Sequence, residues 1–103
     1  MENQKAEYRE AVAWSYQMLG LTKAQDFKNP EALEEELTNY LNDLIVKDFN
    51  KLIGILYRID ISQEKAVAAL AQNADKETAG QTMARLIIDR QKEKLYYRKL
   101  YSK

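Results

Sequence analysis

The side chains that could carry out chemistry fall into two groups of opposite charge. Residues 85–103 hold seven basic side chains and two acidic ones, a local charge of about +5, and three tyrosines stand among them. An acidic group comes near residue 30 and consists of Glu31, Glu34, Glu35 and Glu36. Over the whole chain, 16 Lys and Arg balance 16 Asp and Glu, which argues against a domain that binds polyanions over its entire surface.

Two residue types that dominate enzyme and metal sites, Cys and His, do not occur in the sequence. Without Cys, a disulfide, an iron–sulfur cluster or a thiolate zinc site is excluded. Without His, the commonest general base and transition-metal ligand is missing, so the few serines have no partner for a His-based triad. The three glycines are too far apart for a phosphate-binding loop. We therefore expect no catalytic residue, no metal site and no cofactor, and a chain that is not an enzyme.

The acidic group offers one alternative to that expectation. Glu31 and Glu34 are one helical turn apart, a spacing similar to the Glu pairs with which all-α nucleotide pyrophosphohydrolases hold Mg²⁺. Those enzymes need a second pair of the form Glu-x-x-Asp, and no Glu in this sequence is followed by Asp at that spacing. The preferred interpretation is a solvated first turn of a helix, where negative charge complements the helix dipole.

The C-terminal segment is the strongest candidate for a binding surface. We expect its contact residues to be Arg90, Lys94, Tyr97, Arg98 and Tyr101. The first hypothesis is a protein–protein interaction or self-assembly module, which binds a second copy or another protein. The alternative is association with nucleic acid, because cations can contact phosphates while tyrosines stack on bases. A purely structural role also stays open, since cations near the end of a helix complement its dipole.

Hydrophobic periodicity predicts helices along the whole chain, because apolar residues recur at helical spacing in segment after segment and turn residues are few. The predicted fold class is all-α, a compact bundle of four to five helices in one domain, residues 1–103. The expected helices cover residues 4–19, 30–47, 48–59, 63–72 and 76–101. Asn29 and Pro30 are typical of a helix start, and Phe27 is expected to attach the preceding connector to the core.

The segment of about 48–59 is predicted to be the central helix, because apolar residues occupy more than half of its circumference. Its apolar stripe is rotated from that of the preceding helix, which favours a break near 46–48 with Asp48 as cap; a single bent helix is the alternative. Gly54 suggests that another helix or chain approaches closely there. Arg58 is expected to pair locally with Asp60 or Asp48.

The last helix is predicted to be long. It carries an apolar stripe that ends at Ile87, after which the same positions are Arg90, Lys94, Tyr97 and Tyr101. At 1.5 Å per residue, 25 residues span about 38 Å, more than the roughly 33 Å diameter of a domain of this size. We therefore expect the basic, tyrosine-bearing segment of about 89–103 to project or to fray.

Nothing in the sequence predicts a membrane segment or a signal peptide, since the first residues are polar and no apolar run approaches about 20 residues. The expected location is the cytoplasm, with no membrane partner. The stretches DFNKLIGILYRIDIS (48–62) and LIIDRQ (86–91) resemble segments of a set of small uncharacterised bacterial all-helical proteins. That resemblance covers about a fifth of the chain, implies a bacterial helical protein and supplies no site residue.

Overall fold

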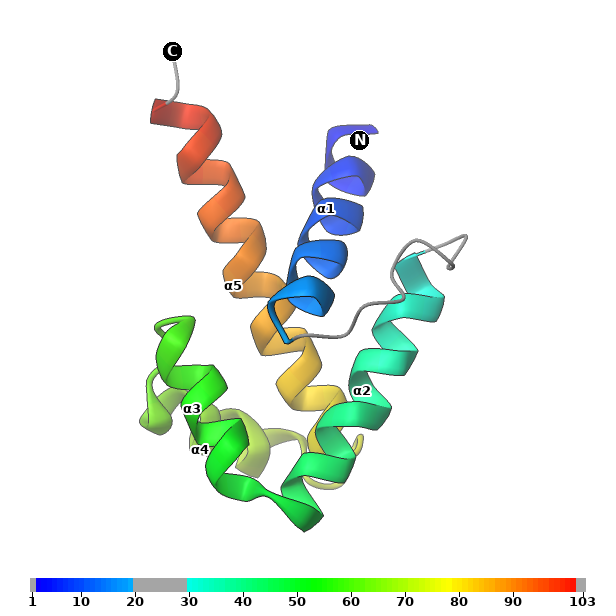
Figure 1. Ribbon diagram of the computed structural model, residues 1–103, viewed down its shortest axis with the longest axis vertical. Coiled ribbons are helices and arrows are strands. Elements are labelled where there is room, and N and C mark those ends of the chain that lie inside the picture. Colours follow the sequence, from blue (N-terminus) through cyan, green and yellow to red (C-terminus); the bar gives the residue numbers. More distant parts are fainter. Residues whose placement is uncertain (1, 20–29, 102–103) are drawn as a thin grey trace.

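The computed structural model describes residues 2–19 and 30–101, and within them every regular element is an α-helix (Figure 1). The helices are α1 (Glu2–Met18), α2 (Pro30–Lys47), α3 (Phe49–Arg58), α4 (Gln63–Asn73) and α5 (Ala79–Tyr101). This confirms the all-α bundle with a long C-terminal helix. Among the described helices, none combines the length and the apolar character that crossing a membrane would require. The expectations for Phe27 and Asn29 fall outside the described residues.

The centre of the bundle is α5, and the prediction that the 48–59 helix lies there is wrong. Both α1 and α2 pack along α5, and α4 also lies against it. The buried side chains of α5 form one continuous face: Thr82, Met83, Ala84, Ile87, Ile88, Gln91 and Leu95. Its 23 residues span about 34 Å, most of the 40 Å length of the molecule.

α3 lies at one end of the bundle, where it packs against α2 and α4 (Figure 1). Leu52, Ile55 and Leu56 are buried, but the side chains of Phe49 and Tyr57 are 51% and 84% exposed. A helix that is apolar over more than half of its circumference, as α3 is, is therefore not necessarily covered on that whole surface. The two aromatic residues that widened its apolar stripe face solvent.

The break between α2 and α3 falls where the change of stripe predicted it. α2 ends at Lys47, and Asp48 caps α3 by accepting a hydrogen bond at its Oδ1 from the backbone N–H of Lys51, at 3.2 Å. The cap satisfies one of the backbone donors that a helix start leaves free. The prediction of a break near residues 46–48, with Asp48 as the cap of the next helix, is confirmed.

A tight turn joins α3 to α4, and two buried residues, Ile59 and Ile61, anchor it on either side of Asp60. Asp60 has φ 67°, a left-handed conformation that Asp tolerates better than most residues. Ser62 caps α4, since its Oγ accepts a hydrogen bond from the backbone N–H of Lys65 at 3.1 Å.

Part of the apolar surface of α4 is exposed. Ala66 is buried and Leu70 is partly buried against the core. Val67 is 56% exposed, however, and Ala71 is also exposed. α4 is short and packs on only one side of α5. The apolar surface of α4 is therefore wider than the part that α5 covers.

The start of α5 is fixed by polar contacts with α2. Thr78 caps the helix, and Thr78 and Gln81 exchange hydrogen bonds between side chain and backbone, at 3.1 and 2.8 Å. Asn42 from α2 accepts from the backbone N–H of Gly80 at 2.8 Å. A Cβ on Gly80 would lie 2.4 Å from Asn42 Cγ, whereas nothing lies within 4 Å of a Cβ added at Gly54. The close approach expected at Gly54 therefore occurs at Gly80.

We expect Gly80→Ala to lower the free energy of unfolding by about 1–2 kcal/mol, because the new methyl group displaces Asn42 and breaks its hydrogen bonds. Gly54→Ala is the matched control. It has room and a helical setting, so it should raise stability by roughly 0.5–1 kcal/mol. Urea denaturation followed by circular dichroism measures both. Equal stabilisation by the two substitutions would contradict the contact at Gly80.

Candidate functional site

The C-terminal half of α5 is attached to α1 along one side. Gln91 is fully buried and Leu95 is 7% exposed, so the buried face of α5 continues past residue 88. Gln91 Nε2 lies 3.4 Å from the sulfur of Met18 in α1. The prediction that the inner face of the helix continues beyond Ile87 through Arg90 and Lys94 is therefore wrong. Gln91 and Leu95 occupy the inner face, and Arg90 and Lys94 lie at its edge.

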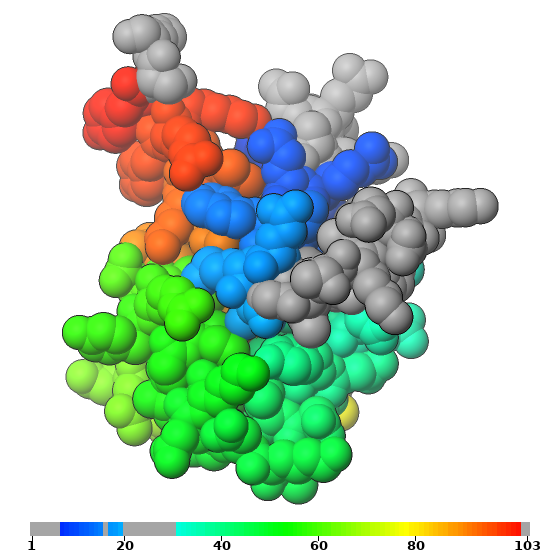
Figure 2. Space-filling model, in the orientation of Figure 1, coloured from blue at the N-terminus to red at the C-terminus, as the bar shows by residue number. Residues whose placement is uncertain are grey.

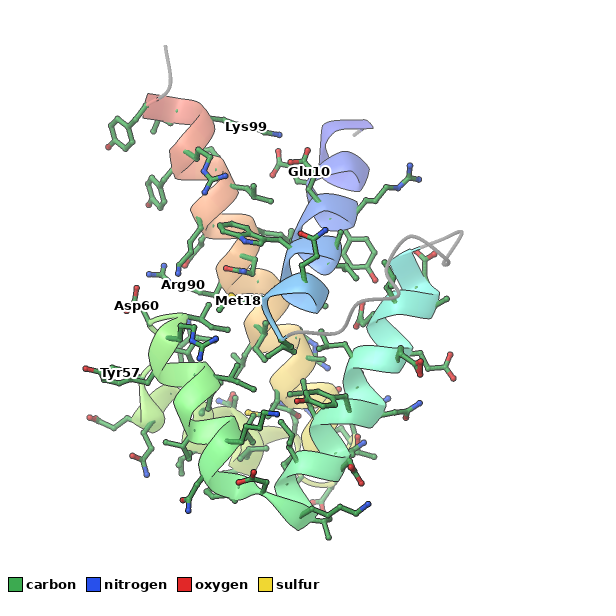
Figure 3. The ribbon with its side chains drawn as sticks, in the orientation of Figure 1. Glu10, Met18, Tyr57, Asp60, Arg90 and Lys99 are labelled. Carbon is green, nitrogen blue, oxygen red and sulfur yellow. The ribbon has the colours of Figure 1, made fainter. Side chains whose placement is uncertain are left out.

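Arg90 and Lys94 contact the turn between α3 and α4. Figure 3 shows Arg90 beside Asp60 of that turn. Arg90 donates from Nε to the backbone oxygen of Ile59 at 3.2 Å and from Nη1 to Glu93 at 2.8 Å. Arg90 Nη2 and Lys94 Nζ each lie 3.9 Å from Asp60 Oδ2. These cations, and not the neighbouring Arg58, are the ion-pair partners that the structure gives to Asp60. The left-handed turn points Asp60 toward α5.

Arg98 and Lys99 contact α1. The guanidinium of Arg98 lies over the ring of Trp14, 4.9 Å from its centroid, a cation–π contact. Lys99 Nζ lies 3.6 Å from Glu10 Oε1, and the two labelled side chains extend toward each other in Figure 3. These contacts, together with Leu95, keep the last turns of α5 beside α1, as Figure 2 also shows for the red and blue parts of the surface.

The opposite side of the same turns is aromatic and exposed. We call it the tyrosine face, and it consists of Tyr96, Tyr97, Leu100 and Tyr101, which are 55%, 51%, 49% and 79% exposed. The rings of Tyr97 and Tyr101 stack with centroids 6.4 Å apart and planes 13° apart. Tyr96 meets Tyr97 edge to face at 5.3 Å. Of the predicted site residues, Tyr97 and Tyr101 belong to this face, whereas Arg90, Lys94 and Arg98 contact other parts of the chain.

Sequence reasoning left Leu100 out of the candidate site. The available signal was its helical position: it lies one turn after Tyr96 and almost opposite the buried Gln91 and Leu95. Once the inner face is known to pass through those two residues, Leu100 must be on the outer face.

A hollow of about 360 Å³ lies next to the tyrosine face, between α4 and α5. Its walls combine both signs of charge with two aromatic rings. They are formed by Lys65, Asp89, Arg90, Lys92, Glu93, Tyr96 and Tyr97. The C-terminal half of α5 thus carries the exposed tyrosine face and, one to two turns earlier, the hollow.

The acidic group lies elsewhere, on the first turns of α2, and α1 stands between it and the end of α5 (Figure 1). There it borders a groove of about 580 Å³ that also includes Tyr8, Glu77 and Arg85. Tyr8 donates its hydroxyl to Glu34, and burial together with that carboxylate raises the pKa of Tyr8 above its usual range. The described residues contain no group of three or more acidic side chains placed to hold a metal ion.

Glu77 also lines this groove, and its contacts change its pKa. It accepts hydrogen bonds from the Thr82 hydroxyl, at 2.6 Å, and from Arg85. The Thr82 contact and then the Arg85 guanidinium hold the pKa of Glu77 below its usual range. Both contacts stabilise the ionised carboxylate of Glu77. The Arg85 guanidinium of the same chain balances its charge.

Comparison with protein-family models, with curated proteins and with solved structures finds no match for this chain.

Proposed function

We propose that this chain is a cytoplasmic, non-enzymatic protein–protein interaction module that self-associates through the tyrosine face. One observation carries the proposal: four large side chains that include three tyrosines lie together, about half exposed or more, on two successive turns of one helix. Aromatic side chains contribute much of the apolar area in protein interfaces, and their hydroxyl groups tolerate water before binding.

The charges around the tyrosine face support this use of it. Arg90 and Lys94 face Asp60, and Arg98 lies over Trp14. In this proposal these three cations position α5, whereas Tyr97 and Tyr101, together with Tyr96 and Leu100, make the contact. A partner that covers the tyrosine face removes aromatic area from water without first breaking those contacts.

Self-association can be tested with the double variant Tyr96→Gln and Leu100→Gln, which keeps helix-forming residues on α5. We expect wild-type chains to associate with increasing concentration, and the double variant to bind roughly 30-fold more weakly, since two central contacts are lost. Tyr57→Gln, at an 84% exposed position on α3, is the matched control and should leave association unchanged. Light scattering after size exclusion measures all three. If Tyr57→Gln weakens association as much as the double variant, another surface is responsible.

Association with nucleic acid is the second candidate function. The observation in its favour is the exposed stack of Tyr97 and Tyr101, since exposed rings can stack on bases. Phosphate contacts weaken steeply with salt, whereas an aromatic protein interface changes little. Binding of a single-stranded oligonucleotide that falls about tenfold between 50 and 200 mM salt, and that the Tyr97→Gln variant abolishes, would favour this candidate.

A further inference from the structure

We propose that Met18 is an oxidation site of this chain: a peroxide converts its thioether to a sulfoxide, and the buried amide of Gln91 donates a hydrogen bond to the new oxygen. The proposal does not depend on self-association. Three features of the described residues carry it: the hydrogen bonds that Gln91 lacks, the recess that opens onto Met18, and the contrast with the buried Met83.

The amide of Gln91 is poorly matched to its surroundings. Gln91 is fully buried, and its Oε1 has no hydrogen-bond partner. Among the described residues, the sulfur of Met18, 3.4 Å from Gln91 Nε2, is the only atom that accepts a hydrogen bond from this amide. A thioether sulfur is a weak acceptor, and a buried polar group without a good partner is costly. A leucine at position 91 would therefore suit the reduced chain equally well.

A sulfoxide at Met18 supplies a stronger acceptor. Oxidation turns the apolar thioether into a polar group with an exposed oxygen on the sulfur. The methionine side chain has three rotatable bonds, so this oxygen can turn toward Gln91 Nε2, which is already in contact with the sulfur. Figure 3 shows Met18 at the C-terminal end of α1, the helix that packs along α5. The oxidised side chain thus keeps a contact between the two helices.

A recess between the end of α1 and α3 gives access to Met18. It has a volume of about 240 Å³, and we call it the Gly54 recess. Its walls are Met18, Leu19, Lys51, Gly54, Ile55 and Arg58. Gly54 is exposed and nothing lies within 4 Å of a Cβ added there, so the missing side chain helps to keep the recess open. Hydrogen peroxide fits this volume easily, since one water molecule occupies about 30 Å³.

The reaction is a two-electron oxidation of the sulfur. The sulfur lone pair of Met18 attacks one oxygen of hydrogen peroxide, and the S–O bond forms as the O–O bond breaks. Water carries a proton from the oxygen that stays on the sulfur to the oxygen that leaves. The products are the sulfoxide and one molecule of water, so the sulfur is oxidised and the peroxide is reduced.

Peptide mapping after peroxide treatment of the full-length chain shows which methionine reacts. The three methionines fall in different tryptic peptides, so mass spectrometry follows each one separately. We expect Met18 to oxidise about tenfold faster than Met83, which is 1% exposed and reacts only when the fold opens locally. Gly54→Leu, which fills the recess, should slow the oxidation of Met18 but not that of Met83. Equal rates at the two methionines in the wild type would overturn the proposal.

Urea denaturation of the reduced and the oxidised protein tests the role of Gln91. Oxidation should raise the unfolding equilibrium constant of Gln91→Leu roughly fivefold more than that of the wild type, since only the wild type gains the new hydrogen bond. Met18→Leu, which conserves volume and receives the same peroxide treatment, is the control for oxidation elsewhere, and its stability should not change. If oxidation destabilises the wild type and Gln91→Leu equally, Gln91 does not hold the sulfoxide and the proposal fails.

A second measurement needs no substitution at position 91, in case Gln91→Leu does not fold. The side-chain amide protons of Gln91 are followed by NMR in the wild type before and after oxidation. We expect a downfield shift of the proton that bonds to the new oxygen, because the sulfoxide is a stronger acceptor than the thioether. Unchanged amide resonances in a chain whose Met18 is fully oxidised would contradict the proposal.

Discussion

Replacing Ile87 by Ala is expected to lower the free energy of unfolding by about 3–4 kcal/mol. Ile87 is fully buried on α5, the helix against which α1, α2 and α4 all pack. The substitution removes buried apolar area and leaves a cavity that helices held on several sides cannot close completely. Urea denaturation monitored by circular dichroism gives the change.

Val67→Ala is the control for that experiment, since it also shortens a β-branched side chain on a helix, but at a 56% exposed position on α4. It should change the free energy of unfolding by less than about 0.5 kcal/mol. If Ile87→Ala had a similarly small effect, α5 would not be the centre of the core.

Leu95→Ala is expected to cost about 2–3 kcal/mol, although Leu95 lies in the segment that the sequence predicted to project or fray. Its side chain is 7% exposed and belongs to the core cluster, in the half of α5 that packs beside α1. Thermal and urea unfolding of the full-length variant measure the loss.

Leu100→Ala provides the internal comparison, because it makes the same chemical change five residues later on the same helix. Leu100 is 49% exposed, so the monomer should lose less than about 0.5 kcal/mol when unfolding is measured at concentrations too low for association. Equal losses at the two positions would mean that the end of α5 has no distinct inner and outer sides.

This difference between Leu95 and Leu100 determines how the interaction surface should be tested. Removing the chain after Asp89 would delete both the tyrosine face and the buried residues Gln91 and Leu95. Loss of association in such a truncation could then follow from a damaged core. Substitutions confined to Tyr96 and Leu100 separate the two effects.

Local signals in the sequence predicted the helices well. The change of apolar stripe after residue 45 predicted the break between α2 and α3, and Asp48 caps α3 as expected. Ser62 and Thr78 cap α4 and α5 through the same kind of local hydrogen bond. Caps and breaks depend on residues a few positions apart, so the sequence contains the necessary information.

Tertiary placement was predicted less well, for a physical reason. α3 carries a wider apolar surface than α5, but Phe49 and Tyr57 remain exposed. α5 includes a fully buried Gln91, a polar residue that sequence patterns assign to the surface. Which helix is central depends on how the helices assemble. The hydrophobic periodicity of a single helix carries no information about that assembly.

The partners of the basic C-terminal residues could not be predicted either. Arg58 was expected to pair with Asp60 or with Asp48, but the left-handed turn at Asp60 directs its carboxylate toward Arg90 and Lys94. Segments about thirty residues apart thus meet because of one turn. The same contacts change the interpretation of the candidate site, from a basic surface to an aromatic one.

The central claim is that the tyrosine face joins two copies of this chain. Light scattering of the wild-type protein over a dilution series, at 50 and 500 mM salt, tests it most directly. We predict a molar mass that rises with concentration from that of the 12.0 kDa chain toward twice that value, at both salt concentrations. A mass that stays at 12.0 kDa up to millimolar concentration would contradict the claim.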